Sequence, residues 1–408
     1  MYKEIKKCRV CGNDNLVEVL NLGDQALTGV FPSSPEQKVT VGPLTLVKCL
    51  GDDAKKHCGL VQLKHSYDLQ ELYGEGYGYR SSLNASMVEH LRNKVSKILS
   101  YVDLNFGDVI VDIGSNDATT LKFYPQNDYE LIGIDPIGSG IEKYYPESIK
   151  LVPDFFNAAV AKRILGNRKA KVITSFSMFY DLEDPISFAK DIANVLDING
   201  IWVLEQSYMP EMLKQNSFDT VCHEHLEYYG LTQIKWIMEK VGLRILNVEF
   251  NAINGGSFSV VVGKKESSLL VNEKLIEQVL EKEKTLELDN LRPYMAFAAK
   301  AAEVREQLLQ KIQSIKREGK TIYGLGASTK GNVILQYCGI TAKDISYIGE
   351  VNEDKFGKYT PGTLIPIIPE KELLAKKPDY LLVLPWHFKT FFEKSVHLRN
   401  IKMVFPLS

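Results

Sequence analysis

The sequence has no long apolar run. None of its hydrophobic stretches approaches the roughly 20 residues of a membrane-spanning helix, and the longest, at 200–206 and 380–386, have the length of a strand. The N-terminus, MYKEIKKCRVCGN, also lacks the apolar core of a secretory signal. We therefore expect a cytoplasmic protein that neither crosses nor binds a membrane.

An excess of charge of one sign is also missing. The chain has 49 Lys and Arg residues against 51 Asp and Glu, for a net charge of −2. This balance argues against a nucleic-acid partner, which a basic face would attract. At 408 residues the chain is too long for one ordinary core, so two or three domains are expected.

Cysteine is scarce but unevenly placed, since four of the six cysteines fall within the first 58 residues. In a reducing compartment such a cluster favours a metal over disulfides. Cys8 and Cys11 have the two intervening residues of a zinc half-site, and Cys49 and Cys58, with eight intervening residues, would complete the site. His57 is an alternative ligand, and four free buried thiols are the alternative without a metal. A four-thiolate site would be structural, because it has no open position.

From residue 108 onward, short β-branched runs alternate with helix-length segments, which predicts an α/β fold with a parallel sheet covered on both faces. Asn254-Gly255-Gly256 between two apolar runs predicts an antiparallel hairpin. A second alternation begins near residue 321. We expect three domains: a small zinc-binding module, a Rossmann-like domain with an antiparallel hairpin, and a C-terminal Rossmann-like domain. Their boundaries are 1–66, 67–270 and 271–408.

The run DVIVDIGSND at 108–117 predicts a strand and a tight turn, with a helix beginning at Leu121 and Phe123. Its single glycine suits a ligand without phosphate, and Asp135, at the end of the next strand, suits ribose hydroxyls. The pattern favours S-adenosylmethionine over NAD, although an acid in that position also occurs in other doubly wound sheets. The expected cofactor-binding residues of this domain are Asp112, Gly114, Ser115, Asn116, Asp135, Asp154, Phe155 and Ser177.

The densest polar cluster is His223-Glu224-His225, followed by Tyr228 and Tyr229. It suits acid–base catalysis; the alternatives are a solvated helix start, with Glu224 near the helix dipole, and a metal site without an evident third ligand. In the last domain the small-residue turn at 324–332 and a second polar turn suit a phosphate, or serve strand–helix packing alone. Their polar residues are Ser328, Lys330, Asn332, Asn352 and Lys355.

Five features occur in one order: the four cysteines, Y-x-Y-R-S-S, DIGSNDATTLKFY, H-E-H-L-x-Y-Y and G-A-S-T-K-G-N. Together they resemble the C-methyltransferases of nucleotide-linked deoxysugars over essentially the whole chain. The resemblance implies structural zinc, S-adenosylmethionine, and a nucleotide-diphosphate-linked 4-keto-6-deoxysugar held partly by the C-terminal domain. It implies deprotonation at C3 to an enolate, followed by methyl transfer, in a monomer or weak homo-oligomer.

The same resemblance assigns roles to residues. His225 is the candidate base, Glu224 orients it or contacts a sugar hydroxyl, and Tyr77 or Tyr79 assists at the enolate. Arg80 and Ser81 belong near the amino-acid end of the cofactor, and His223, Tyr180, Cys222, Tyr228 and Tyr229 complete the expected site. The family often has Tyr where Cys222 stands and His near Tyr180, so the sugar configuration is open. An O- or N-methyltransferase, a non-catalytic relative and a zinc-ribbon nucleic-acid-binding protein are the alternatives.

Overall fold

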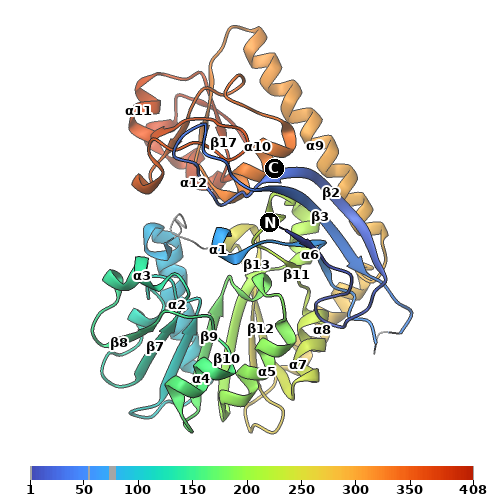
Figure 1. The fold of residues 1–408 in the computed structure, drawn as a ribbon, viewed down its shortest axis with the longest axis vertical. Helices are drawn as coiled ribbons and strands as arrows, with labels where there is room; N and C mark the ends of the chain where they lie inside the picture. Colours follow the sequence, from blue (N-terminus) through green and yellow to red (C-terminus); the bar gives the residue numbers. More distant parts are fainter. Residues whose placement is uncertain (1, 54–55, 73–79, 408) are drawn as a thin grey trace.

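The computed structural model describes residues 2–53, 56–72 and 80–407, which form three domains stacked along the long axis (Figure 1). The central domain lies at one end and the C-terminal domain at the other, and the N-terminal strands lie between them. Tyr77 and Tyr79 lie outside the described residues. No helix in the described part of the chain has the length and apolar character that crossing a membrane requires.

The central domain contains a seven-stranded sheet in the order β12-β13-β10-β9-β6-β7-β8. All neighbours are parallel except β13, which runs antiparallel to both β10 and β12, so the predicted hairpin is confirmed. The strands are β6 (Val109–Ile113), β7 (Glu130–Ile134), β8 (Ile149–Val152), β9 (Ala170–Phe176), β10 (Leu196–Ser207), β12 (Leu243–Asn251) and β13 (Ser257–Lys264).

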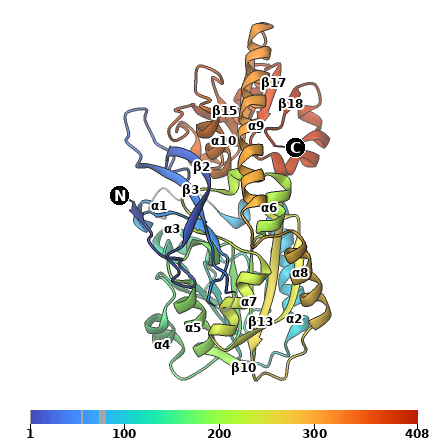
Figure 2. The same cartoon turned by 90° about the vertical axis from the view of Figure 1, so that its right-hand side faces the viewer.

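Helices cover both faces of this sheet because its apolar residues point alternately to either side. Ile110 belongs to the core cluster that includes helix α2 (Ala85–Tyr101), and the next residue, Val111, belongs to the cluster that includes α5 (Pro185–Val195). Figure 2 shows α2 on one side of the sheet and α4, α5 and α7 on the other. The other helices between β6 and α9 are α3 (Gly138–Ile141), α4 (Ala158–Leu165), α6 (Met209–Gln215), α7 (Leu231–Lys240) and α8 (Glu273–Thr285).

The helix predicted to follow β6 is wrong. Leu121–Phe123 forms only a single 3₁₀ turn. Ala118 precedes it in the left-handed region, with φ of 60°, which a helix does not permit. Pro125 follows two residues later and cannot continue the helix.

The N-terminal domain contains an antiparallel sheet in the order β11-β4-β3-β2, a more regular structure than its turn-rich sequence suggested. Its strands β2 (Leu16–Ala26), β3 (Val41–Cys49) and β4 (Val61–Leu63) come from the first 63 residues. The fourth strand, β11 (Glu227–Tyr228), comes from the central domain. Two short segments, β1 (Lys3–Glu4) and β5 (His65–Ser66), form a separate pair, and α1 (Leu69–Leu72) follows.

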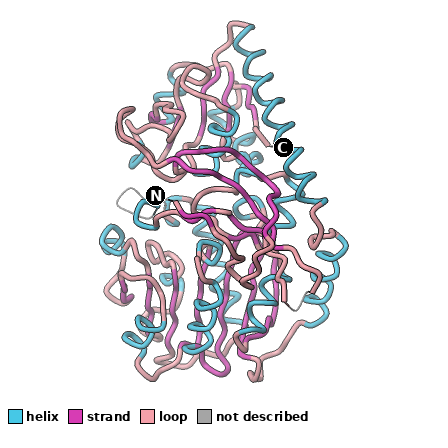
Figure 3. Tube along the Cα trace, turned by 45° about the vertical axis from the view of Figure 1, so that its right-hand side comes forward, coloured by secondary structure: helices cyan, strands magenta, loops and turns pink. Residues whose placement is uncertain are grey.

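The C-terminal domain contains a five-stranded parallel sheet in the order β16-β15-β14-β17-β18. The helix α9 (Arg292–Arg317) leads into it, with Pro293 in its first turn, and runs beside β2 and β3 (Figures 1 and 3). The other elements are β14 (Ile322–Leu325), α10 (Thr329–Cys338), β15 (Ile348–Glu350), β16 (Ile367–Pro369), α11 (Glu370–Ala375), β17 (Tyr380–Val383), α12 (Lys389–Lys394) and β18 (Lys402–Val404).

Candidate functional site

The turn after β6 depends on the backbone conformation of its glycine. Gly114 adopts φ of +70°, and a Cβ placed on it would lie 3.1 Å from the Met178 side chain. The backbone of this turn therefore approaches the end of β9 more closely than another residue would allow. The Ser81 backbone N–H donates to Asn116 Oδ1 at 3.1 Å, which ties the segment before α2 to this turn.

Asp135 lies at the carboxyl end of β7 and is buried beside the same turn. Its Oδ2 accepts from the Asn116 N–H and its Oδ1 from the Ile137 N–H, both at 2.9 Å. Each carboxylate oxygen retains a lone pair, so the side chain can still accept ribose hydroxyls. A single-glycine turn beside a ribose acid fits S-adenosylmethionine, whose nucleoside Asp135 would hold.

The other predicted cofactor residues surround this turn. Asp112 is buried and accepts a hydrogen bond from Thr174, and burial raises its pKa to about 7. Ser115 Oγ lies 2.7 Å from Tyr145 Oη. Ser177 follows β9 in the left-handed region with φ of 53°.

Three further predicted residues lie toward the edges of the cofactor region. Asp154 follows β8 and accepts from Arg163 at 2.9 Å, and the neighbouring Phe155 is half exposed. Arg80 donates to Tyr144 Oη at 2.6 Å and pairs with Asp354 of the C-terminal domain at 3.3 Å. Arg80 thus links the central and C-terminal domains, while Ser81 is hydrogen-bonded to the cofactor turn.

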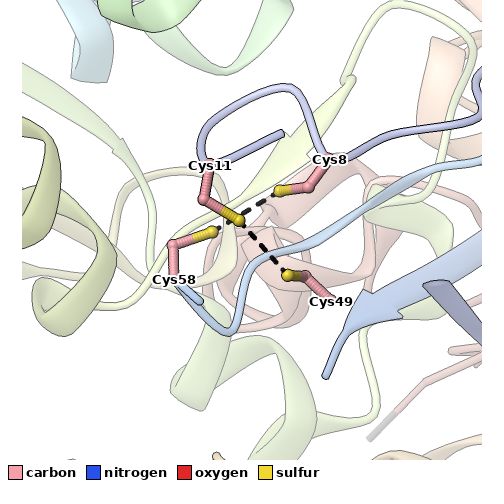
Figure 4. A group of neighbouring side chains, drawn as sticks. All are labelled: Cys8, Cys11, Cys49 and Cys58. Atoms are coloured by element: carbon pink, nitrogen blue, oxygen red, sulfur yellow. Dashed lines mark hydrogen bonds between the residues drawn. The ribbon is translucent and has the colours of Figure 1, made fainter. Parts of the chain in front are cut away.

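The four N-terminal cysteines converge on one point. The sulfur atoms of Cys8, Cys11, Cys49 and Cys58 lie within 4.8 Å of one another. Figure 4 shows the four side chains pointing toward a common centre. His57 packs against Gly51 and does not join this group. Four thiolates at these separations fit one tetrahedral zinc ion without an open position. The predicted ligand set is the one that the structure brings together.

His225 lies just before β11, and its hydrogen-bond partner fixes its tautomer. Its Nδ1 is 2.9 Å from the Thr220 carbonyl oxygen. Because a carbonyl can only accept, Nδ1 carries the proton and Nε2 keeps its lone pair. Burial and then the charge of Lys330 lower the pKa of His225 to about 4, so the ring is neutral near pH 7. The Tyr180 ring lies 4.2 Å from it, centroid to centroid.

His223 and Glu224 face the N-terminal domain. His223 Nδ1 accepts from the Thr28 N–H at 3.3 Å, and the Tyr67 ring meets the imidazole edge-on at 4.6 Å. Burial lowers the pKa of His223 to about 4 and raises that of Glu224. Glu224 does not begin a helix: it lies in a turn that the His225 N–H closes by donating to the Cys222 carbonyl at 3.2 Å, and β11 follows.

The remaining aromatic and thiol residues of this motif divide between the cavity and the core. Tyr180 and Tyr228 line a small cavity with His225 and Glu227. Tyr229 is buried against Phe179, with ring centroids 5.5 Å apart. Cys222 is fully buried, and burial raises the pKa of its thiol.

The C-terminal turn residues bridge to the other two domains. Lys330 Nζ donates to the Asn254 carbonyl of the hairpin turn at 2.7 Å, and Asn332 donates to the Thr28 carbonyl at 2.8 Å. Ser328 caps α10 by accepting from the Gly331 N–H. Lys355 donates to the Ala327 carbonyl, and Asn352 Oδ1 accepts from the Asp354 N–H. Lys330 is the member of this group whose charge lowers the pKa of His225.

One buried polar cluster was missed from the sequence. Glu205, on β10, accepts from His90 and pairs with Lys94 at 3.0 Å, both on α2. Although burial raises it, these two partners bring the pKa of Glu205 below its usual value. An acidic residue near the carboxyl end of an otherwise apolar strand was the available signal; its partners lie more than a hundred residues away.

Together the fold and the cofactor turn define a class I methyltransferase. A methyltransferase-domain family matches residues 87–248, a zinc binding domain family matches residues 8–73, and the "C-methyltransferase C-terminal domain" family matches residues 252–407. The chain is 29% identical to the C-methyltransferase NovU of Streptomyces niveus over 391 residues, 95% of this chain and 91% of NovU.

Two solved structures match part of the chain. LepI in complex with SAM matches with a TM-score of 0.35 and 14% identity, over 45% of this chain and 54% of LepI. Magnesium protoporphyrin IX methyltransferase ChlM from Synechocystis matches with a TM-score of 0.33 and 10% identity, over 43% and 79% of the two chains.

The three family matches together span most of the chain, and with the NovU match they support the resemblance to zinc-containing, three-domain C-methyltransferases that the sequence motifs indicated. The protein is a SAM-dependent C-methyltransferase with S-adenosylmethionine and structural zinc as its cofactors.

Proposed function

We propose that this enzyme methylates C3 of a nucleotide-linked 4-keto-6-deoxysugar. A sugar C–H is acidic enough to lose its proton only beside a carbonyl, so a 4-keto group is required. When bound, S-adenosylmethionine supplies an electrophilic methyl group. His225 Nε2 accepts the C3 proton, and the electron pair of that C–H bond then forms the new C–C bond while the S–CH₃ bond breaks.

The observation that carries this proposal is the state of His225. The Nδ1–H bond to the Thr220 carbonyl holds the ring in the tautomer whose Nε2 can accept a proton. At neutral pH the ring is uncharged because its pKa is lowered to about 4 by burial and by Lys330. The Tyr180 ring against it could supply a hydroxyl near the developing enolate oxygen.

A groove between the two larger domains suits the nucleotide. Its volume is about 830 Å³, within the range of small-molecule sites. Aromatic faces can stack on a base, and lysines can pair with a diphosphate. The lining includes Tyr208, Phe250, Trp386, His387, Lys282 and Lys389. The groove adjoins the cavity at His225 along one segment, because Tyr208 lines the groove and its neighbours Ser207 and Met209 line the cavity.

Mass spectrometry of incubations with S-adenosylmethionine and a panel of 4-keto-6-deoxy nucleotide sugars tests the proposal. We expect one nucleotide sugar to gain a methyl group, and its C3 proton to exchange with deuterated solvent when the cofactor is left out. His225→Asn should lower both rates at least about 100-fold. The exposed His397→Asn, which removes a histidine paired with Glu370, should change neither.

Methyl transfer without C3 exchange would contradict the proposal and favour O- or N-methylation. Wild-type rates in His225→Asn would refute the base assignment. Thermal stabilisation by single-stranded RNA, but by no nucleoside diphosphate, would favour the nucleic-acid-binding alternative.

A further inference from the structure

The catalytic segment is a strand of the zinc-binding domain's sheet. Directly after His225, the chain pairs antiparallel with β4, with Glu227 opposite Gln62 and Tyr228 opposite Val61. The Leu63 N–H donates to the Leu226 carbonyl at 2.8 Å and extends this pairing toward the histidine. The backbone that carries His225 is thus fixed on one side by the N-terminal domain.

This sheet edge lies next to the metal ligands. Cys58 precedes the first residue of β4, Val61, by three positions. The Cys58 carbonyl accepts a hydrogen bond from Gln233 Nε2 at 3.0 Å, so helix α7, which follows β11, is hydrogen-bonded to this cysteine. Both ends of the stretch from His225 to Gln233 therefore contact the chain around Cys58.

Arg9 makes the second connection. It stands between Cys8 and Cys11, and its side chain is only 2% exposed. The guanidinium donates to the Leu63 carbonyl at 2.7 Å and to Ser66 Oγ at 2.8 Å, and its Nε lies 3.9 Å from Glu227 Oε1. It also pairs with the half-exposed Glu183 at 3.4 Å.

Glu227 depends on this contact. Its side chain is fully buried, and neither carboxylate oxygen has a hydrogen-bond partner among the described residues. Burial raises the pKa of Glu227 well above its ordinary value, and the Arg9 guanidinium opposes that shift, so Arg9 favours the position in which Glu227 lies in β11. Glu227 lines the small cavity together with His225.

We propose that zinc positions the catalytic base: the metal fixes the Cys8–Cys11 turn and Cys58, and Arg9 transmits that order through Glu227 and β4 to the strand next to His225. Arg9 is a positioning residue, since it does not reach the reacting atoms. The inference rests on the proposed function for His225 as base, but the order of β11 can be measured without substrate.

Amide hydrogen exchange is the first test. Removing zinc from the wild-type enzyme with a chelator should speed exchange in the peptide covering residues 222–229 and at the Leu63 amide by at least about tenfold. Peptides of β6 and β7 in the cofactor unit should keep their protection. Equal loss in both regions, or no change in either, would refute the proposal.

Arg9→Met, with zinc content checked by native mass spectrometry, is the second test. We expect zinc to be retained, exchange in residues 222–229 to rise about tenfold, and kcat to fall by a similar factor with KM for S-adenosylmethionine unchanged. Arg9→Lys should recover part of both losses. Lys64→Met, which removes a positive charge from the same domain, is the matched control and should match the wild type.

Wild-type exchange and kcat in Arg9→Met would overturn the inference. If Arg9→Met does not fold, the zinc-removal measurement decides alone. If the exchange results hold while His225→Asn keeps full activity, the coupling stands and the base assignment fails.

Discussion

The pH dependence of C3–H exchange gives a quantitative test of the state of His225. The pKa of this histidine is about 4, against 6.5 for an ordinary one, because the ring is buried and Lys330 is close. A lowered histidine pKa keeps the neutral, base-competent form down to the lowered value, so exchange should persist as pH falls and be lost through about pH 4. At pH 5, about 90% of a histidine with pKa 4 is neutral, against about 3% at pKa 6.5, roughly a 30-fold difference in the fraction of base-competent enzyme.

The assay follows deuterium incorporation at C3 by NMR from about pH 3 to pH 8, without S-adenosylmethionine, and subtracts the rate of His225→Asn. Lys330→Met removes the neighbouring positive charge, so the pKa of His225 should rise and the acid limb should move to higher pH. An acid limb near pH 6.5 in the wild type, or one that Lys330→Met leaves in place, would refute this account of the base.

Three further predictions concern stability and the cofactor. Burial raises the pKa of Asp112 to about 7, so the folded state loses stability as pH rises from about 4 to 7. In urea unfolding, the free energy of unfolding of Asp112→Asn should therefore rise relative to that of the wild type by roughly 3–4 kcal/mol over this pH range. Gly114→Ala should cost about 1–2 kcal/mol in thermal unfolding and weaken S-adenosylmethionine binding in calorimetry, because the residue has φ of +70° and Met178 lies 3.1 Å from the added Cβ. Glu205→Gln should destabilise by about 2 kcal/mol, because buried Lys94 loses one of its two carboxylate partners and keeps only Glu249. The exposed Glu89→Gln should stay within about 0.5 kcal/mol, and equal effects would contradict the role of the buried cluster.

The parts of the site that depend on local sequence could be predicted. The strand, the glycine turn and the acid ending the next strand lie within 108–135, and each has a backbone reason that a single sequence expresses. The tetrathiolate site followed from residue type, although the spacing between Cys49 and Cys58 was unusual. The fold class also followed from local patterns, namely the alternation of strand-like and helix-length runs and the turn of the hairpin, and the structure confirms it.

Long-range pairing could not be predicted. The attachment of β11 to β4 joins residues 166 positions apart on average, and a two-residue strand carries no periodicity of its own. The Glu205 cluster brings residues of α2 and β10 together only after the domain has folded. The false helix at Leu121 arose because its apolar residues suggested a helix, while the positive φ of Ala118 has no signal in the residue type.

The fourth strand of the N-terminal sheet also has a consequence during synthesis. Domains usually fold in order as they leave the ribosome. Here β4 is complete at residue 63, but its partner emerges only with Glu227 and Tyr228. Until then one edge of that sheet has no strand to pair with, and such edges recruit strands from other chains. A nascent chain that binds zinc early would still lack the fourth strand of this sheet. A fragment that ends before residue 227 should therefore self-associate instead of remaining monomeric.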